Sequence, residues 1–140
     1  MALESGLREF SWPIRVYYED TDAAGIVYHA NYLRFMERAR TEWLRRIGYE
    51  QDKLGADAGI AFVVRRISID YLRPARFNDE IAVVSRVLRH GRASLEFEQR
   101  VVAADELLSL ATVKVGCVQV YSMRPTAMPP DVYMEVCNAC

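Results

Sequence analysis

Apolar side chains between residues 31 and 47 recur with the spacing of an α-helix. At roughly 100° per residue they form one broad arc, which consists of Tyr32, Leu33, Phe35, Met36, Ala39, Trp43, Leu44 and Ile47. Most charged side chains of the segment fall outside this arc, and Gly48 stands where a C′ glycine commonly ends a helix. The pattern predicts one long amphipathic helix over residues 31–47.

Elsewhere the apolar positions follow a period of two. This alternation predicts strands at residues 12–18, 62–72, 80–88, 93–103 and 107–121. The short turns expected at residues 89–92 and 104–106 require antiparallel pairing of the strands that they join. A proline-rich stretch then precedes a short helix expected at residues 131–140.

The apolar arc of the helix and the apolar face of the sheet each need a partner, and each is the nearest partner for the other. The sequence therefore predicts an α+β fold, in which a twisted antiparallel sheet of about five strands wraps around one long central helix. No repeat or break in composition suggests a linker, so residues 1–140 are expected to form a single domain.

Composition excludes several classes of protein. The chain has 140 residues, of which 51% are hydrophobic and 26% charged, and its net charge of −1 gives no reason to expect a nucleic acid or an anionic membrane as partner. The longest run without a charged residue, residues 23–33, is too short to span a bilayer. Residues 1–10 lack a secretory signal, and the odd number of cysteines fits a reducing compartment, so we expect a cytoplasmic protein.

An acidic loop at residues 19–25 directly precedes the predicted helix. The N-terminus of a helix offers backbone N–H groups without intrahelical partners, which can stabilise an oxygen atom as it becomes an oxyanion. Asp22 lies just upstream, where it could deliver its carboxylate or an activated water, and Gly25 allows a sharp turn. A thioester would need little more, because a thiol with a pKa of about 8.5 leaves as thiolate without strong acid help.

The residues of this segment resemble a known signature. Residues 18–40 match Y-x-D-T-D-x-x-G-x-V-Y-x-x-N-Y-x-x-x-x-E-x-A-R, the motif of the 4-hydroxybenzoyl-CoA thioesterase family, and the similarity extends over nearly the whole chain. Within that family the chain resembles the bacterial acyl-CoA thioesterases associated with the Tol–Pal cell-envelope system. The resemblance implies a hot-dog fold, thioester hydrolysis without metal or cofactor, and active sites shared across a dimer interface.

The resemblance also implies which residues act. The family's catalytic aspartate falls on Asp22, and its neighbouring active-site positions fall on Tyr18 and His29. In the family, the backbone N–H at the position of His29 is thought to polarise the thioester carbonyl. Asp22 is expected to serve either as nucleophile or as general base, and the sequence leaves both roles open.

Structural roles remain open for the same residues. Asp22 could form an Asx-turn or cap, Tyr18 could be a core aromatic of a strand, and His29 could simply be a helix-entry residue. Asp20 is the alternative base, although we favour it as an acceptor that shapes the loop. With two histidines in the chain and no second ligand at a suitable spacing, no metal site is expected.

Several arginines are candidates for structural or substrate-binding roles. Arg40 falls inside the apolar arc, and Glu37 is its nearest carboxylate in sequence. We therefore expect an internal ion pair between them that stabilises the helix. The alternative is that Glu37 is a second catalytic carboxylate. Because coenzyme A carries phosphates, Arg89 and Arg92, which flank a predicted turn, are candidate substrate-binding residues. Further arginines lie around the second strand, at positions 65, 66, 73 and 76.

The cysteines show no recognisable chemistry in sequence. Cys137 and Cys140 form a C-x-x-C motif at the C-terminus, without the helix N-terminus of a redox dithiol or the further ligands of a zinc site, so we interpret it as incidental. Cys117 is expected in the last strand as a small buried hydrophobe.

The expected function is hydrolysis of short-to-medium-chain acyl-CoA by a homodimer or homotetramer, with acyl carrier protein as a further candidate partner and no membrane insertion. Two other functions remain open. One is a hot-dog hydratase or dehydratase, and the other is a non-enzymatic protein that binds acyl-thioesters or biogenesis enzymes of the envelope.

Overall fold

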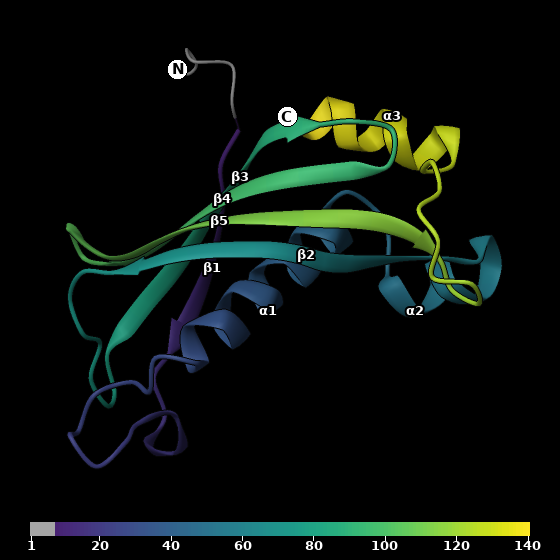
Figure 1. The fold of residues 1–140 in the computed structure, drawn as a ribbon. Coiled ribbons are helices and arrows are strands. Elements are labelled where there is room, and N and C mark those ends of the chain that lie inside the picture. The colour runs from purple at the N-terminus through teal and green to yellow at the C-terminus, as the bar shows by residue number, and fades with distance from the viewer. Residues whose placement is uncertain (1–7) are drawn as a thin grey trace.

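The computed structural model describes residues 8–140 (Figure 1). Most of the N-terminal segment in which no secretory signal is expected therefore lies outside the described residues. The elements in chain order are β1 (Phe10–Arg15), a 3-10 helix (Tyr18–Asp20), α1 (Asn31–Arg46), α2 (Gln51–Lys53), a π-helical turn (Leu54–Ala58), β2 (Ile60–Tyr71), β3 (Glu80–His90), β4 (Ser94–Ala103), β5 (Glu106–Gln119) and α3 (Pro130–Ala139).

All five strands form one antiparallel sheet in the order β1-β3-β4-β5-β2. The expected turns are confirmed between β3 and β4 and between β4 and β5, where Ala104 has a φ of 52°. Along β4, Leu95, Phe97 and Val101 are buried while the alternate residues are half-buried, as the period of two predicts. Among the described strands, β2 pairs only with β5, so no strand of residues 8–140 covers its other edge.

Helix α1 lies against one face of the sheet, where it contacts β1 and β3 (Figure 1). Phe35, Met36 and Ala39 are completely buried in the interface. The helix ends as expected, because Gly48 adopts a φ of 108° and its N–H donates to Arg45 O at 3.0 Å, while Tyr49 N–H donates to Leu44 O at 3.0 Å. These two bonds form a Schellman motif, which satisfies carbonyls that the helix leaves without partners.

The first strand begins at Phe10 and ends at Arg15, two to three residues earlier than the predicted 12–18, and the chain then turns. The N–H of Tyr17 donates to the Asp20 carboxylate at 2.8 Å, and Asp20 N–H donates to Tyr17 O at 3.0 Å. This reciprocal pair starts the 3-10 helix, so the prediction that Tyr18 lies in a strand was wrong. Asp20 acts here as the loop-shaping acceptor that we favoured.

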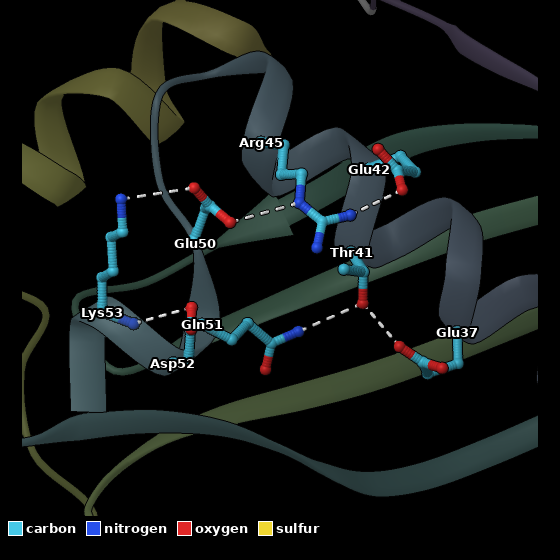
Figure 2. A network of polar contacts seen from close by, with 8 residues as sticks. All are labelled: Glu37, Thr41, Glu42, Arg45, Glu50, Gln51, Asp52 and Lys53. Carbon is cyan, nitrogen blue, oxygen red and sulfur yellow. Dashed lines mark hydrogen bonds and ion pairs between the residues drawn. The ribbon is translucent and has the colours of Figure 1, made fainter. Parts of the chain in front are cut away.

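A polar network covers the junction between α1 and α2 (Figure 2). Thr41 donates to Glu37 and accepts from Gln51, while Arg45 pairs with both Glu42 and Glu50. These side chains are partly or fully exposed to solvent, so each pair adds little to the free energy of unfolding. The sequence did not reveal α2 or the π-helical turn, which connect α1 to β2.

No helix within residues 8–140 is both long enough and apolar enough to cross a membrane.

Candidate active site

The loop before α1 is a small hairpin tied to the helix start. Thr21 and Val27 form an antiparallel bridge, and on either side of it Asp22 N–H donates to Ile26 O and Tyr28 N–H donates to Asp20 O, both at 2.9 Å. The Asn31 side chain donates to the same Asp20 carbonyl at 2.9 Å. The hairpin that carries Asp22 is therefore fixed to the first residue of α1.

Asp22 is exposed at the tip of this hairpin. Its Oδ1 accepts a hydrogen bond from the N–H of Ala24 at 2.9 Å. This bond forms the Asx-turn that we considered as a structural role for Asp22. Its Oδ2 has no hydrogen-bond donor among residues 8–140, so one carboxylate oxygen remains available for chemistry. The turn also depends on Gly25, whose φ of 80° favours glycine.

The start of α1 leaves two N–H groups unused. The N–H groups of Asn31, Tyr32 and Leu33 donate to the carbonyls three residues before them, at 2.8, 3.3 and 3.1 Å. Those of His29 and Ala30 have no acceptor within the described part of the chain. The N-cap has no side-chain hydrogen bond and the first turn has no acidic residue, so no side chain offsets the positive end of the helix dipole.

An open recess of about 260 Å³ lies beside this helix start. We call it the helix-entry recess, and it is lined by Ile26, Val27, His29, Tyr32, Tyr71, Leu72, Arg73 and Pro74. Its lining is mainly apolar and aromatic, with Arg73 as the cation. Such a recess suits a ligand that is largely apolar and has a few polar atoms.

Tyr71, at the end of β2, connects the sheet to the helix start. Its hydroxyl donates to His29 O at 3.1 Å, and its ring lies edge-on to the rings of His29 and Tyr32, with centroids 5.9 and 5.5 Å away. The pKa of Tyr71 is raised by burial, so the phenol keeps its proton at neutral pH. The carbonyl of His29 belongs to the same peptide group as the N–H of Ala30, so this bond fixes the plane of one unused donor.

His29 lines the recess, whereas Asp22, Tyr18, Arg89 and Arg92 are not among its lining residues. Tyr18 is 81% exposed and packs edge-on against Phe77, with ring centroids 5.9 Å apart. Arg89 lies 4.0 Å from Glu96, and the Arg92 guanidinium sits 5.2 Å from the Tyr133 ring centroid.

Both arginines lie at the far end of the sheet from the Asp22 hairpin. The segment before β3 contacts that hairpin through the bridge of Ile26 with Arg76, and β3 then runs for 11 residues, or roughly 36 Å at 3.3 Å per residue. Within one protomer the structure thus does not bring Arg89 or Arg92 to Asp22.

The expected ion pair between Arg40 and Glu37 was wrong. The Arg40 guanidinium donates to the Gln99 side chain at 2.9 Å, and Glu37 accepts from Thr41 instead. Burial lowers the pKa of Arg40, while the charge of Glu37 acts in the opposite direction. No ion pair joins the two side chains in the described structure.

Gln99 is the centre of a buried polar cluster that the sequence analysis missed. It is fully buried, and its amide nitrogen donates to Met36 O and to Ser85 Oγ, each at 2.9 Å. The sequence did contain a signal for this cluster, because Gln99 is a polar residue at a position of β4 where the alternation places apolar side chains. Arg40 and Glu37 also line a second cavity of about 150 Å³, between α1 and the β2, β4 and β5 strands.

Comparisons with known proteins agree with this architecture. Residues 16–136 match the model of the thioesterase-like superfamily. A Haemophilus influenzae protein named acyl-CoA thioesterase YbgC is 49% identical over 123 residues, which cover 88% of this chain and 90% of the relative. An Escherichia coli protein named acyl-CoA thioester hydrolase YbgC is 46% identical over 127 residues, covering 90% of this chain and 94% of the relative.

Among solved structures, a probable thioesterase from Bartonella henselae superimposes with a TM-score of 0.81 at 33% identity, covering 89% of this chain and 100% of that one. The resemblance seen in residues 18–40 is thereby confirmed, as is the hot-dog fold with a five-stranded antiparallel sheet. The chain belongs to the thioesterase-like superfamily.

Proposed function

We propose that this chain hydrolyses acyl-CoA thioesters to a free acid and coenzyme A. The observation that carries the proposal is the pair of unused N–H groups of His29 and Ala30, beside an open recess at a helix N-terminus. Relatives named as acyl-CoA thioesterases, similar over almost the whole chain, support the choice of substrate. Short-to-medium acyl chains remain our expectation.

In this mechanism the thioester carbonyl oxygen accepts the N–H groups of His29 and Ala30. Attack on the carbonyl carbon turns that oxygen into an oxyanion, which the two donors and the helix dipole stabilise. The tetrahedral intermediate then expels the coenzyme A thiolate, which needs no strong acid. Backbone donors suit this role because their direction is set by the fold rather than by a flexible side chain.

Asp22 is the proposed catalytic carboxylate. Its Oδ1 is held by Ala24 N–H. Its free Oδ2 either attacks the carbonyl carbon, which gives a mixed anhydride that water then hydrolyses, or removes a proton from the attacking water. His29 lines the recess and would contact the substrate. Tyr18, on the exposed 3-10 helix, lies apart from the recess and would contribute only if a partner copy brings it to the site.

A second copy of the chain completes the proposed site. Residues 1–140 would form one hot-dog domain, and α1 would become a central helix once a partner covers the β5–β2 side of the sheet. The open edge of β2 supports a homodimer or homotetramer of this kind. Arg89 and Arg92 are too far from Asp22 in their own protomer, so they would bind coenzyme A phosphates only in a partner's site. Acyl carrier protein is a further candidate partner, and the cytoplasm the expected location.

The decisive test is Asp22→Asn, assayed for free thiol release with acyl-CoA from acetyl to palmitoyl and with acyl carrier protein thioesters. We expect at least a hundredfold loss of kcat with an unchanged thermal melt, since the amide cannot act as nucleophile or base. Near-normal hydrolysis by the variant would remove Asp22 from the mechanism. Hydration of crotonyl-CoA without thiol release would indicate a hydratase, and no turnover by the wild type would indicate a binding protein.

A further inference from the structure

The structure gives the C-terminal cysteines a context that the sequence lacks. Cys137, on α3, lies with its Sγ 3.9 Å from Nδ1 of His90, at the end of β3. Tyr133, one helical turn before Cys137, packs edge-on against the His90 ring at 5.8 Å and lies under the Arg92 guanidinium at 5.2 Å. We call these four residues, Cys137, His90, Tyr133 and Arg92, the thiol cluster.

We propose that Cys137 is a site of reversible S-thiolation by small anionic disulfides, with His90 as its base and Arg92 as the cation that favours an anionic reactant. The site lies at the opposite end of β3 from the Asp22 hairpin and does not depend on the proposed hydrolysis.

The three cysteines differ in the properties that control thiol reactivity. Cys117 is fully buried in β5 and out of reach of a solute. Cys140 donates its thiol proton to Val136 O at 3.0 Å, and burial, together with the nearby Cys137, raises its pKa to about 11. Cys137 is half-buried and is the thiol that contacts an imidazole. Since the thiolate is the reactive form, Cys137 is the expected nucleophile.

The exchange needs no oxidant other than the small disulfide. His90 Nδ1 accepts the thiol proton, and the Cys137 sulfur attacks one sulfur of the disulfide. The S–S bond breaks, and the leaving thiolate takes up the proton from the imidazolium. The product is a mixed disulfide on Cys137 and one free small thiol, and excess thiol reverses the reaction.

The charges around the cluster favour a negatively charged reactant. Arg92 has no ion-pair partner among residues 8–140, whereas Arg89 is partly balanced by Glu96 at 4.0 Å. Glu135, on the same helix, faces another cavity, next to Arg8 and Arg46. The Arg92 cation, stacked on Tyr133, therefore favours an anionic reactant at the cluster, and it acts against the negative end of the α3 dipole, where Cys137 lies.

The test incubates the full-length protein at pH 7 with glutathione disulfide, which is anionic, or with cystamine, which is cationic, and follows each cysteine-containing peptide by mass spectrometry. We expect a glutathionyl adduct on Cys137, reversed by dithiothreitol, well before any on Cys117 or Cys140. His90→Gln should slow the adduct about fivefold. This figure lies below an upper limit of about thirtyfold, the rate gain at pH 7 if a thiol of pKa 8.5 were fully ionised. The gain is smaller than this limit because a thiolate becomes a weaker nucleophile as its pKa falls.

A charge variant provides the matched control. Arg92→Gln should lower the ratio of the glutathione disulfide rate to the cystamine rate by about threefold. Arg66→Gln removes another exposed cation, from β2, and should leave that ratio unchanged. The proposal is overturned if Cys140 or Cys117 reacts as fast as Cys137, or if His90→Gln reacts at the wild-type rate in a protein with a wild-type melt. Neither result would bear on thioester hydrolysis.

Discussion

Tyr71 provides a sharp test of the proposed oxyanion site, because its hydroxyl donates to the backbone of the helix start. It donates to His29 O at 3.1 Å and so holds the peptide whose N–H, on Ala30, is an unused donor. Tyr71→Phe removes this bond and keeps the ring that packs against His29 and Tyr32. The variant isolates the orientation of one peptide group.

The expected effect follows from the strength of a single neutral hydrogen bond, about 0.5–1.5 kcal/mol. If most of this free energy serves to hold the Ala30 N–H toward the developing oxyanion, kcat should fall roughly three- to tenfold. KM should change little, because the ground-state carbonyl is a weaker acceptor than the oxyanion. The effect should be smaller than that of deleting an oxyanion donor outright, about a hundredfold or more.

The assay measures kcat and KM for a short-chain acyl-CoA by thiol release. Tyr121→Phe serves as control, because Tyr121 is 97% exposed and lies outside the lining of the recess, and it should leave both constants unchanged. A wild-type kcat for Tyr71→Phe would refute the role of this hydrogen bond. A raised KM at constant kcat would indicate that Tyr71 only contacts bound substrate.

Two further predictions concern stability. Gln99→Leu should lower the free energy of unfolding by about 2–4 kcal/mol in urea titrations, because it leaves the Arg40 guanidinium without its acceptor. Gln119→Leu, at an exposed site, should change it by less than about 0.5 kcal/mol, and equal losses for the two variants would contradict a special role for the buried cluster. Burial also raises the pKa of Tyr32, so the folded state favours the neutral phenol. The stability that this provides is present below the unfolded pKa of about 10 and is lost as pH rises through the higher folded pKa. Tyr32→Phe should therefore show a shallower fall in the free energy of unfolding above pH 10. An unchanged slope would contradict the assignment.

The sequence by itself determined the features that depend on neighbours along the chain. The helical period predicted α1 within one residue, and Gly48 ended it in the expected conformation. The alternation in β4 and the turn at Ala104 also follow from local pattern. The motif at residues 18–40, which runs from the loop into α1, indicated the family. These features are predictable because their physical causes, side-chain periodicity and backbone conformation, act over a few residues.

Only the tertiary structure decided the contacts between distant segments. It paired β2 with β5 rather than with its neighbour in sequence, β3. The structure also placed Tyr71 against His29, 42 positions apart, Cys137 against His90, 47 apart, and Arg40 against Gln99, 59 apart. Side chains at such separations meet because of strand order and helix packing, which depend on burying the whole apolar surface at once. No local pattern encodes them.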